Sequence, residues 1–166
     1  MPARESPGSA AADGAVGETT VRVRYAETDQ MGRAYYGAYF AWFEVGRVEL
    51  LRGLGATYAE LEREGCLLPV VEAGARYLAP ARYDEEILVR TELVSSGPLR
   101  MEFSSEVVSK EGARRIAEGR VVLACMGPEG RRRRLPPELR AKAEEAARTG
   151  GRTRARPRAR GEGGSQ

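Results

Sequence analysis

The sequence predicts an α+β fold in which an antiparallel sheet of five to six strands curls around one long central helix. Two observations predict it. Residues 37–54 are apolar on more than one face, as expected of a helix buried in the middle of a domain. Four strand-like segments follow, and short links join the last three, which favours antiparallel hairpin neighbours. A chain of 166 residues fits one domain of this kind.

The N-terminal part is predicted to contribute one strand. Residues 1–18 are rich in Ala, Gly, Ser and Pro, and we expect them to be disordered because they have little apolar surface to bury. Order should begin near Thr19, because apolar and basic side chains alternate over residues 20–25, the period of a half-buried strand. Turn-prone residues at 28–32 end this strand.

After the long helix, the pattern changes to that of strands. Residues 58–64 form a short amphipathic helix closed by Gly65. The strand at 99–109 is the clearest, because apolar and polar side chains alternate strictly along it. The four strands are expected at residues 67–78, 86–94, 99–109 and 113–126.

These elements predict a single domain that spans residues 19–135. A proline-initiated, exposed terminal helix is expected at 136–148. The Arg/Gly-rich tail at 149–166 is predicted to be disordered. Charge is uneven: the formal net charge is −4 for residues 1–126 and +7 for residues 127–166.

Composition argues against several kinds of site. The chain has no histidine and only two cysteines, Cys66 and Cys125, so we expect no metal and no cofactor. The two cysteines lie in apolar contexts and are interpreted as packing residues in a reducing compartment. The sequence has neither the apolar core of a signal peptide nor an apolar run of membrane-spanning length. A cytoplasmic location without membrane contact is therefore expected.

The segment from Tyr25 to Glu44 places one acid, Asp29, ahead of the long helix. A helix N-terminus presents unpaired N–H groups and the positive end of the helix dipole, so a carboxylate and a polarised carbonyl could meet there. This arrangement suggests acyl-transfer chemistry. The residues alone leave open that Asp29 is only a turn or capping residue.

A motif in this segment resembles the signature of the 4-hydroxybenzoyl-CoA thioesterase-like branch of the hotdog superfamily. It has the form D-x-x-G-x-x-Y-Y-x-x-Y, and the resemblance extends over about residues 20–126. It implies a hotdog fold, an acyl-CoA thioesterase, and a homodimer or dimer of dimers with active sites at the interface. The motif residues are Asp29, Gly32, Tyr35, Tyr36 and Tyr39, and they are followed by Phe43, Glu44 and Arg47.

The resemblance also implies roles for two catalytic groups. Asp29 would attack the thioester carbonyl carbon or activate water to do so, and the backbone N–H of Tyr36 would hold the carbonyl oxygen. Some family members have a histidine at the position of Tyr36, and its assistance is lost here.

Four further residues are candidates for substrate binding, and each has a structural alternative. Gly32 lets the backbone approach a ligand or simply turn. Tyr35 and Tyr39 line an acyl pocket or pack between sheet and helix. Glu44 projects into a dimer cleft or forms a helical ion pair with Arg47.

The basic C-terminal part allows three readings. Arg131 and Arg132 suit contacts with the phosphates of coenzyme A. The same charges could bind RNA or DNA, although the aromatic residues that stack bases are lacking, or they could be only solvated. The competing functions are therefore a non-catalytic acyl-CoA-binding hotdog protein and a nucleic-acid-associated protein. A hydratase is disfavoured, because by resemblance its chemistry uses histidine.

Overall fold

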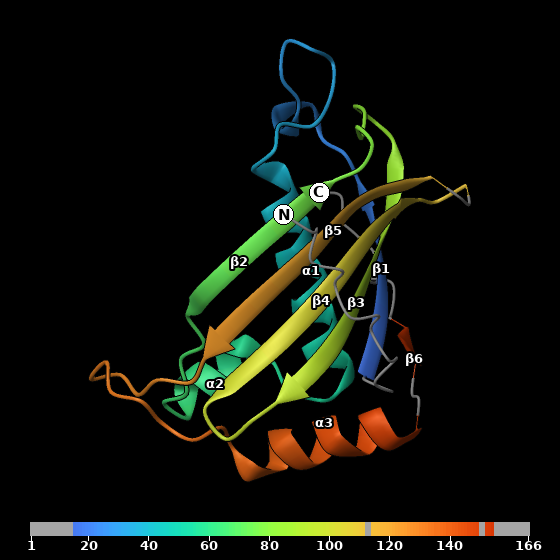
Figure 1. The fold of residues 1–166 in the computed structure, drawn as a ribbon. Helices are drawn as coiled ribbons and strands as arrows, with labels where there is room; N and C mark the ends of the chain where they lie inside the picture. The colour runs from blue at the N-terminus through green and yellow to red at the C-terminus, as the bar shows by residue number, and fades with distance from the viewer. Residues whose placement is uncertain (1–14, 112–113, 150–151, 155–166) are drawn as a thin grey trace, which may run out of the picture.

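The computed structural model describes residues 15–111, 114–149 and 152–154. It shows a six-stranded sheet that wraps around helix α1 (Figure 1), which confirms the predicted α+β class. The strand order is β2-β5-β4-β3-β1-β6, and every pair is antiparallel except β1 with β6. The elements are β1 (Ala15–Arg22), a 3-10 turn (Tyr25–Glu27), α1 (Ala38–Gly53), α2 (Tyr58–Arg63), β2 (Val70–Tyr77), β3 (Glu86–Ser96), β4 (Arg100–Ser109), β5 (Arg115–Ala124), α3 (Pro137–Thr149) and β6 (Arg152–Arg154).

Helix α1 lies in the middle of the fold because it is apolar on several faces. Trp42 and Phe43 are almost inaccessible to solvent. A Cβ atom on Gly119 of β5 would collide with the Phe43 ring, and one on Gly46 would collide with Thr91 of β3. These close approaches fix the helix on the sheet, and with it the position of the helix N-terminus.

The two faces of the sheet differ as the alternation in the sequence predicts. On β4, Met101 and Phe103 are buried toward α1. The outer face carries opposite charges on neighbouring strands, and Arg115 Nε donates to Glu106 Oε1 at 2.8 Å. Exposed pairs of this kind contribute little to stability, but they mark this face as one that contacts water.

The structure corrects both ends of the predicted domain. Strand β1 begins at Ala15 rather than near Thr19, because residues 15–22 pair with β3 over their whole length and Ala15 is fully buried. Within the tail that was predicted to be disordered, Arg152–Arg154 pair with β1 as β6. Pairing at a sheet edge satisfies backbone groups whatever the side chains are. Residues 1–14 and 155–166 lie outside the described residues.

The terminal helix also differs from the prediction. Helix α3 begins at Pro137, close to the predicted start, but it is not exposed all round. Leu139 and Ala143 are buried, together with Leu135 just before the helix. An apolar stripe at i and i+4 accounts for this packing, and α3 covers the end of the core opposite the loop that joins β1 to α1 (Figure 1).

Candidate functional site

Asp29 lies in a tight loop ahead of α1. Its Oδ1 accepts a hydrogen bond from the N–H of Met31 at 2.8 Å, and its own N–H donates to the carbonyl of Arg33 at 2.9 Å. Gly32 has a φ of +70°, a conformation that favours glycine. The loop itself therefore positions Asp29. Asp29 is not the cap of α1, whose N-cap residue is Gly37.

Glu27 connects this loop to the helix. Its buried carboxylate accepts hydrogen bonds from Trp42 Nε1 at 3.2 Å and from the N–H and guanidinium of Arg24 at 2.8 and 2.9 Å. Burial alone would raise the pKa of Glu27, but the hydrogen bonds from Arg24 and Trp42 outweigh burial and hold the pKa below its ordinary value. Glu27 was not predicted as a site residue, because nothing in the sequence distinguishes a glutamate that is buried and hydrogen-bonded from an exposed one.

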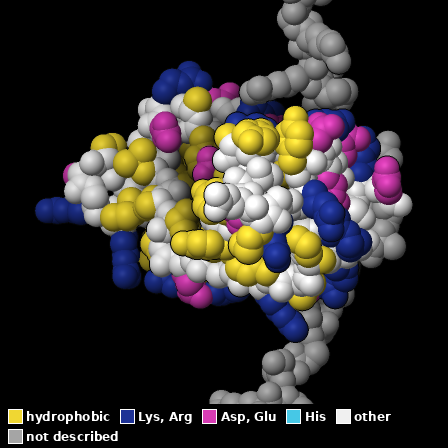
Figure 2. Space-filling view, turned by 90° about the horizontal axis from the view of Figure 1, so that it is seen from above, with side chains coloured by type: hydrophobic (Ala, Val, Ile, Leu, Met, Phe, Trp, Pro, Cys, Tyr) yellow, Lys and Arg dark blue, Asp and Glu magenta, His cyan; other side chains and the backbone are white. Residues whose placement is uncertain are grey.

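A cleft of about 360 Å³ opens beside Asp29, and we call it the Asp29 cleft. The loop, the turn before α1 and the end of β2 line it. Tyr36 and Tyr39, both predicted site residues, line it together with Asp29, and Tyr77 of β2 also lines it. Figure 2 looks onto this end of the molecule and shows hydrophobic side chains gathered there. Mostly apolar walls with one carboxylate suit an acyl group with a reacting carbonyl.

Tyr36 sits at the turn that starts the helix. The N–H of Ala38 donates to the carbonyl of Tyr35 at 3.0 Å, so Tyr36 is the second residue of a tight turn. Tyr77 Oη donates to the carbonyl of Tyr36 at 2.8 Å. Across the described residues, the N–H of Tyr36 has no hydrogen-bond partner. A free N–H at a helix start is a ready donor for a negatively charged oxygen.

Tyr39 and Tyr35 occupy different environments. Tyr39 is buried, its ring contacts Trp42 and Tyr77, and burial raises its pKa. Tyr35 is 45% exposed and does not line the Asp29 cleft. Its ring instead covers the backbone of Gly37. Of the two tyrosines, Tyr39 has the position of a pocket wall.

A second cleft, of about 600 Å³, lies at the other end of β2 between α1, α2 and the loop after β5. We call it the Arg47 cleft. The Arg47 side chain is buried, its Nε donates to Tyr58 Oη at 3.2 Å, and its Nη2 lies 3.6 Å from Glu44 Oε2. Glu44 thus lines this cleft and not the Asp29 cleft of the same chain. Arg131 and Arg132 are exposed in the loop whose first residues line it.

The two cysteines are neighbours beside the Arg47 cleft, although 59 positions separate them in the sequence. Their Sγ atoms are 2.8 Å apart, and both side chains are buried. Leu67 and Met126, the residues that follow them, exchange two backbone hydrogen bonds. Burial, followed by the hydrogen bond and charge of Cys125, raises the pKa of Cys66 to about 12.

The described residues contain no group of three or more acids or cysteines placed to hold a metal ion. Within those residues, the helices are also too short or too polar to cross a membrane.

Comparisons with known proteins agree with the motif. Residues 23–143 match the family model described as the Thioesterase-like superfamily. Over 108 residues the chain is 32% identical to the acyl-CoA thioester hydrolase YbgC of Escherichia coli, covering 65% of this chain and 80% of that protein. A 76-residue stretch is 45% identical to Bacillus subtilis YneP, covering 46% of this chain and 55% of that protein, so the match spans about half of YneP.

Solved structures show the same relationship. Protein TT1821 of Thermus thermophilus superposes with a TM-score of 0.73 at 33% identity, covering 78% of this chain and 98% of that protein. A DHNA-CoA thioesterase of Staphylococcus aureus superposes with a TM-score of 0.76 at 28% identity, covering 85% of this chain and 99% of that protein. The chain therefore has the hotdog fold and belongs to the Thioesterase-like superfamily.

Proposed function

We propose that the protein is an acyl-CoA thioesterase, which hydrolyses a coenzyme A thioester to the free acid and coenzyme A. The observation that carries the proposal is a carboxylate, Asp29, and an unpaired backbone N–H, that of Tyr36, bordering one largely apolar cleft. Membership of the family and the thioester substrates named for YbgC and the S. aureus enzyme support it.

The chemistry needs little beyond these two groups. The Asp29 carboxylate either attacks the carbonyl carbon, giving a mixed anhydride that water then hydrolyses, or removes a proton from the attacking water. Negative charge develops on the carbonyl oxygen, where the N–H of Tyr36 is a preorganised donor. The sulfur leaves as a thiolate, and because thiols have a pKa near about 8.5, the leaving group needs little protonation. A chain without histidine can support such a reaction.

Residues around Asp29 are proposed to bind the substrate. Tyr39, with Tyr77, would wall the acyl group, and Gly32 would let the Asp29 loop turn close to it. Tyr35 would contribute only from the rim, because it is not part of the cleft wall.

Glu44 lines the Arg47 cleft, and Arg131 and Arg132 directly follow Gly130, which also lines it. In our proposal these three residues therefore reach a thioester held by Asp29 from a second copy of the chain. Arg131 and Arg132 would then meet the phosphates of coenzyme A. We therefore propose a homodimer as the working unit, and a dimer of dimers stays a prediction.

The decisive test compares Asp29→Asn with wild type on aromatic, short-chain and fatty acyl-CoA substrates. Asparagine keeps an Oδ1 for the Met31 N–H, so the loop should fold while kcat falls by roughly 10²- to 10⁴-fold. Asp84→Asn makes the same change at an exposed aspartate and should retain activity.

Two outcomes would contradict the proposal. Full activity of Asp29→Asn would leave Asp29 as a turn residue only. A wild-type protein that binds coenzyme A but hydrolyses none of the panel would instead be a non-catalytic acyl-CoA-binding protein.

Nucleic-acid binding that truncation after Gly150 abolishes would assign a separate role to the tail.

A further inference from the structure

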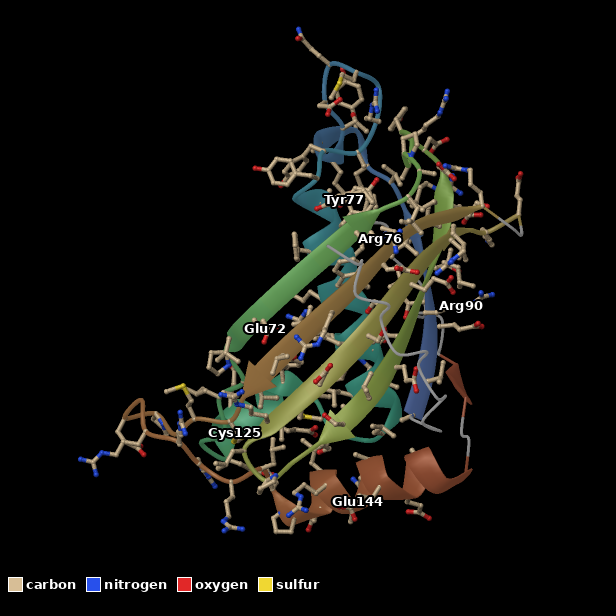
Figure 3. The ribbon with its side chains drawn as sticks, in the orientation of Figure 1. Glu72, Arg76, Tyr77, Arg90, Cys125 and Glu144 are labelled. Carbon is tan, nitrogen blue, oxygen red and sulfur yellow. The ribbon has the colours of Figure 1, made fainter. Side chains whose placement is uncertain are left out.

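The carbonyl of Tyr36 is held by a side chain and not by the backbone of the helix that follows it. The N–H of Phe40 donates instead to the carbonyl of Gly37 at 3.2 Å. Tyr77 Oη donates to the Tyr36 carbonyl at 2.8 Å, from the end of β2 that lies beside the start of α1 (Figure 3). Across the part of the chain that the structure describes, no second donor reaches this carbonyl.

This hydrogen bond completes the restraint on the turn that carries the N–H of Tyr36. A peptide unit is planar, so holding its carbonyl also fixes the direction of the N–H in the same plane. The carbonyl of Tyr35, in the plane that contains the Tyr36 N–H, accepts from the N–H of Ala38 at 3.0 Å. The carbonyl of Tyr36, in the next plane, accepts from Tyr77. Both planes that meet at Tyr36 are therefore held, one by the helix and the other by the sheet.

Tyr77 has a defined position because other aromatic rings support it. Its ring meets Tyr39 nearly edge-on, with the ring centroids 4.9 Å apart. Tyr39 in turn packs on Trp42, whose Nε1 donates to the carboxylate of Glu27. The backbone carbonyl of Glu27 accepts from the N–H of Tyr35 at 3.0 Å. These contacts lead from β2 back to the turn, so they hold the Tyr77 hydroxyl and the turn in one relative position.

The hydroxyl of Tyr77 also changes the electrostatics beside the cleft. Tyr36 and Tyr77 both line the Asp29 cleft. A carbonyl oxygen carries partial negative charge, and without a partner it would oppose the negative charge that develops on a thioester oxygen nearby. Burial raises the pKa of Tyr77, so the hydroxyl keeps its proton at neutral pH and remains a donor.

We propose that the Tyr77 hydroxyl is a positioning group for the oxyanion donor: it holds the Tyr36 carbonyl, and through it the orientation of the Tyr36 N–H at the Asp29 cleft. This inference rests on the proposed function. It gives Tyr77 two separable parts, because the ring walls the acyl group and the hydroxyl acts only through Tyr36. Tyr77→Phe separates them, since phenylalanine keeps the ring and loses the hydrogen bond.

The first test observes the backbone of Tyr36 without catalysis. The chain contains one Tyr–Tyr bond, between Tyr35 and Tyr36, and one Tyr–Gly bond, between Tyr36 and Gly37. A protein labelled with ¹³C in the tyrosine carbonyl and with ¹⁵N in tyrosine and glycine therefore has only these two amides bonded to a labelled carbonyl. Its HNCO spectrum reports the N–H of Tyr36 in one signal and the carbonyl carbon of Tyr36 in the other.

In Tyr77→Phe the carbonyl signal of Tyr36 should move upfield, because a carbonyl carbon is less deshielded once its oxygen loses a hydrogen bond. The N–H signal of Tyr36 should move as well. Tyr83→Phe is the matched control, because Tyr83 is exposed, contacts Tyr25 and lies outside the Asp29 cleft. It should leave both signals in place. An unmoved carbonyl signal in Tyr77→Phe would overturn the proposal.

The second test is a double-mutant cycle on kcat with the best acyl-CoA substrate. Tyr77→Phe should lower kcat by roughly three- to tenfold, the effect of about one neutral hydrogen bond, and should leave KM within about twofold because the ring stays. Tyr36→Pro removes the N–H that Tyr77 positions and keeps the turn. In that background Tyr77→Phe should change kcat by less than about twofold, because no donor is left to position. Tyr83→Phe should retain the kcat and KM of wild type.

The outcomes separate this inference from the proposed function. Equal fold-losses of kcat from Tyr77→Phe in the wild-type and Tyr36→Pro backgrounds would show that the hydroxyl acts independently of the Tyr36 N–H, and would overturn the inference with hydrolysis intact. An unchanged kcat in Tyr77→Phe despite a moved carbonyl signal would do the same. A wild-type protein that hydrolyses no thioester would instead contradict the proposed function itself, and the role of Tyr77 would fall with it.

Discussion

The two clefts at opposite ends of β2 are supported by different chemistry. Polar contacts hold the Asp29 cleft: Glu27 binds Trp42, and Tyr77 binds the carbonyl of Tyr36. Beside the Arg47 cleft, buried packing holds the wall that contains the two thiols, although Arg47 also donates to Tyr58 and pairs with Glu44. Hydrogen bonds fix the orientation of the groups that they join, and an acid and an amide that act on one carbonyl need fixed orientations. Packing alone fixes the volume of a cavity. This difference favours the Asp29 cleft as the place of the proposed hydrolysis.

After Asp29→Asn, the largest expected effect comes from removing the N–H of Tyr36, which changes the Asp29 cleft alone. Proline is favoured at the second position of a tight turn, so Tyr36→Pro should preserve the turn between Tyr35 and Ala38. If this N–H holds the developing oxyanion, kcat should fall by roughly 10²- to 10³-fold. Steady-state hydrolysis of the best acyl-CoA substrate measures the change.

Tyr36→Ala is the matched control, because it removes the same side chain and keeps the N–H. It should retain kcat within about tenfold, a limit well short of the loss expected for a missing oxyanion donor. Equal kcat values for the alanine and proline variants would show that the backbone amide takes no part in the reaction.

The next effect tests the support of the Asp29 loop. Glu27→Gln keeps the shape of the side chain but removes the charge that binds Arg24. Hydrogen bonds to a charged group contribute about 1.5–3 kcal/mol, so the variant should lose an amount of this order in unfolding free energy at pH 7. Urea unfolding followed by fluorescence of Trp42, the only tryptophan, measures it.

The pH dependence of this variant has a definite sign. The pKa of Glu27 is lowered in the folded protein, so its contribution is present above the ordinary glutamate pKa and is lost as pH falls through the folded value. The difference between wild type and Glu27→Gln should therefore shrink below about pH 4.3. Glu64→Gln, at an exposed position, should show no such convergence. A constant difference from pH 7 to pH 3 would contradict the assigned role of Glu27.

The comparison also shows what could be predicted from the sequence. Helix α1 and strands β3 to β5 were predicted because local periodicity and short links define them. Asp29, Tyr36 and Tyr39 share a cleft because they are close in sequence around one helix start. A local sequence pattern can predict that these residues lie together, because a helix and the loop that precedes it can adopt few relative positions.

The unpredicted parts depend on contacts between distant positions. Tyr77 meets Tyr36 across 41 positions. Arg47 was interpreted through its pair with Glu44, which does exist, but its burial beside Tyr58 depends on where α2 packs. The strand β6 formed because an edge of β1 was available, which no pattern within the tail encodes. Such features follow from the assembled sheet and not from any single segment.

The smallest expected effect is a loss of stability at alkaline pH, and it comes from Cys66 beside the Arg47 cleft. The folded-state pKa of Cys66 is raised to about 12, so the unfolded chain loses this proton first as pH rises. Stability should then fall above about pH 8.5, by an amount of about 1–2 kcal/mol at pH 10 from this thiol. Cys66→Ala should be less stable than wild type at pH 7, but should lose less stability between pH 8 and pH 10, so the two curves converge. Tyr39 and Tyr58, whose pKa values burial also raises, are present in both proteins and cancel in the difference. Urea unfolding under reducing conditions measures the unfolding free energy of both proteins at each pH. If the two curves of free energy against pH run parallel, the Cys66 thiol ionises as readily in the folded protein as in the unfolded chain. Packing beside the Arg47 cleft would then not exclude charge.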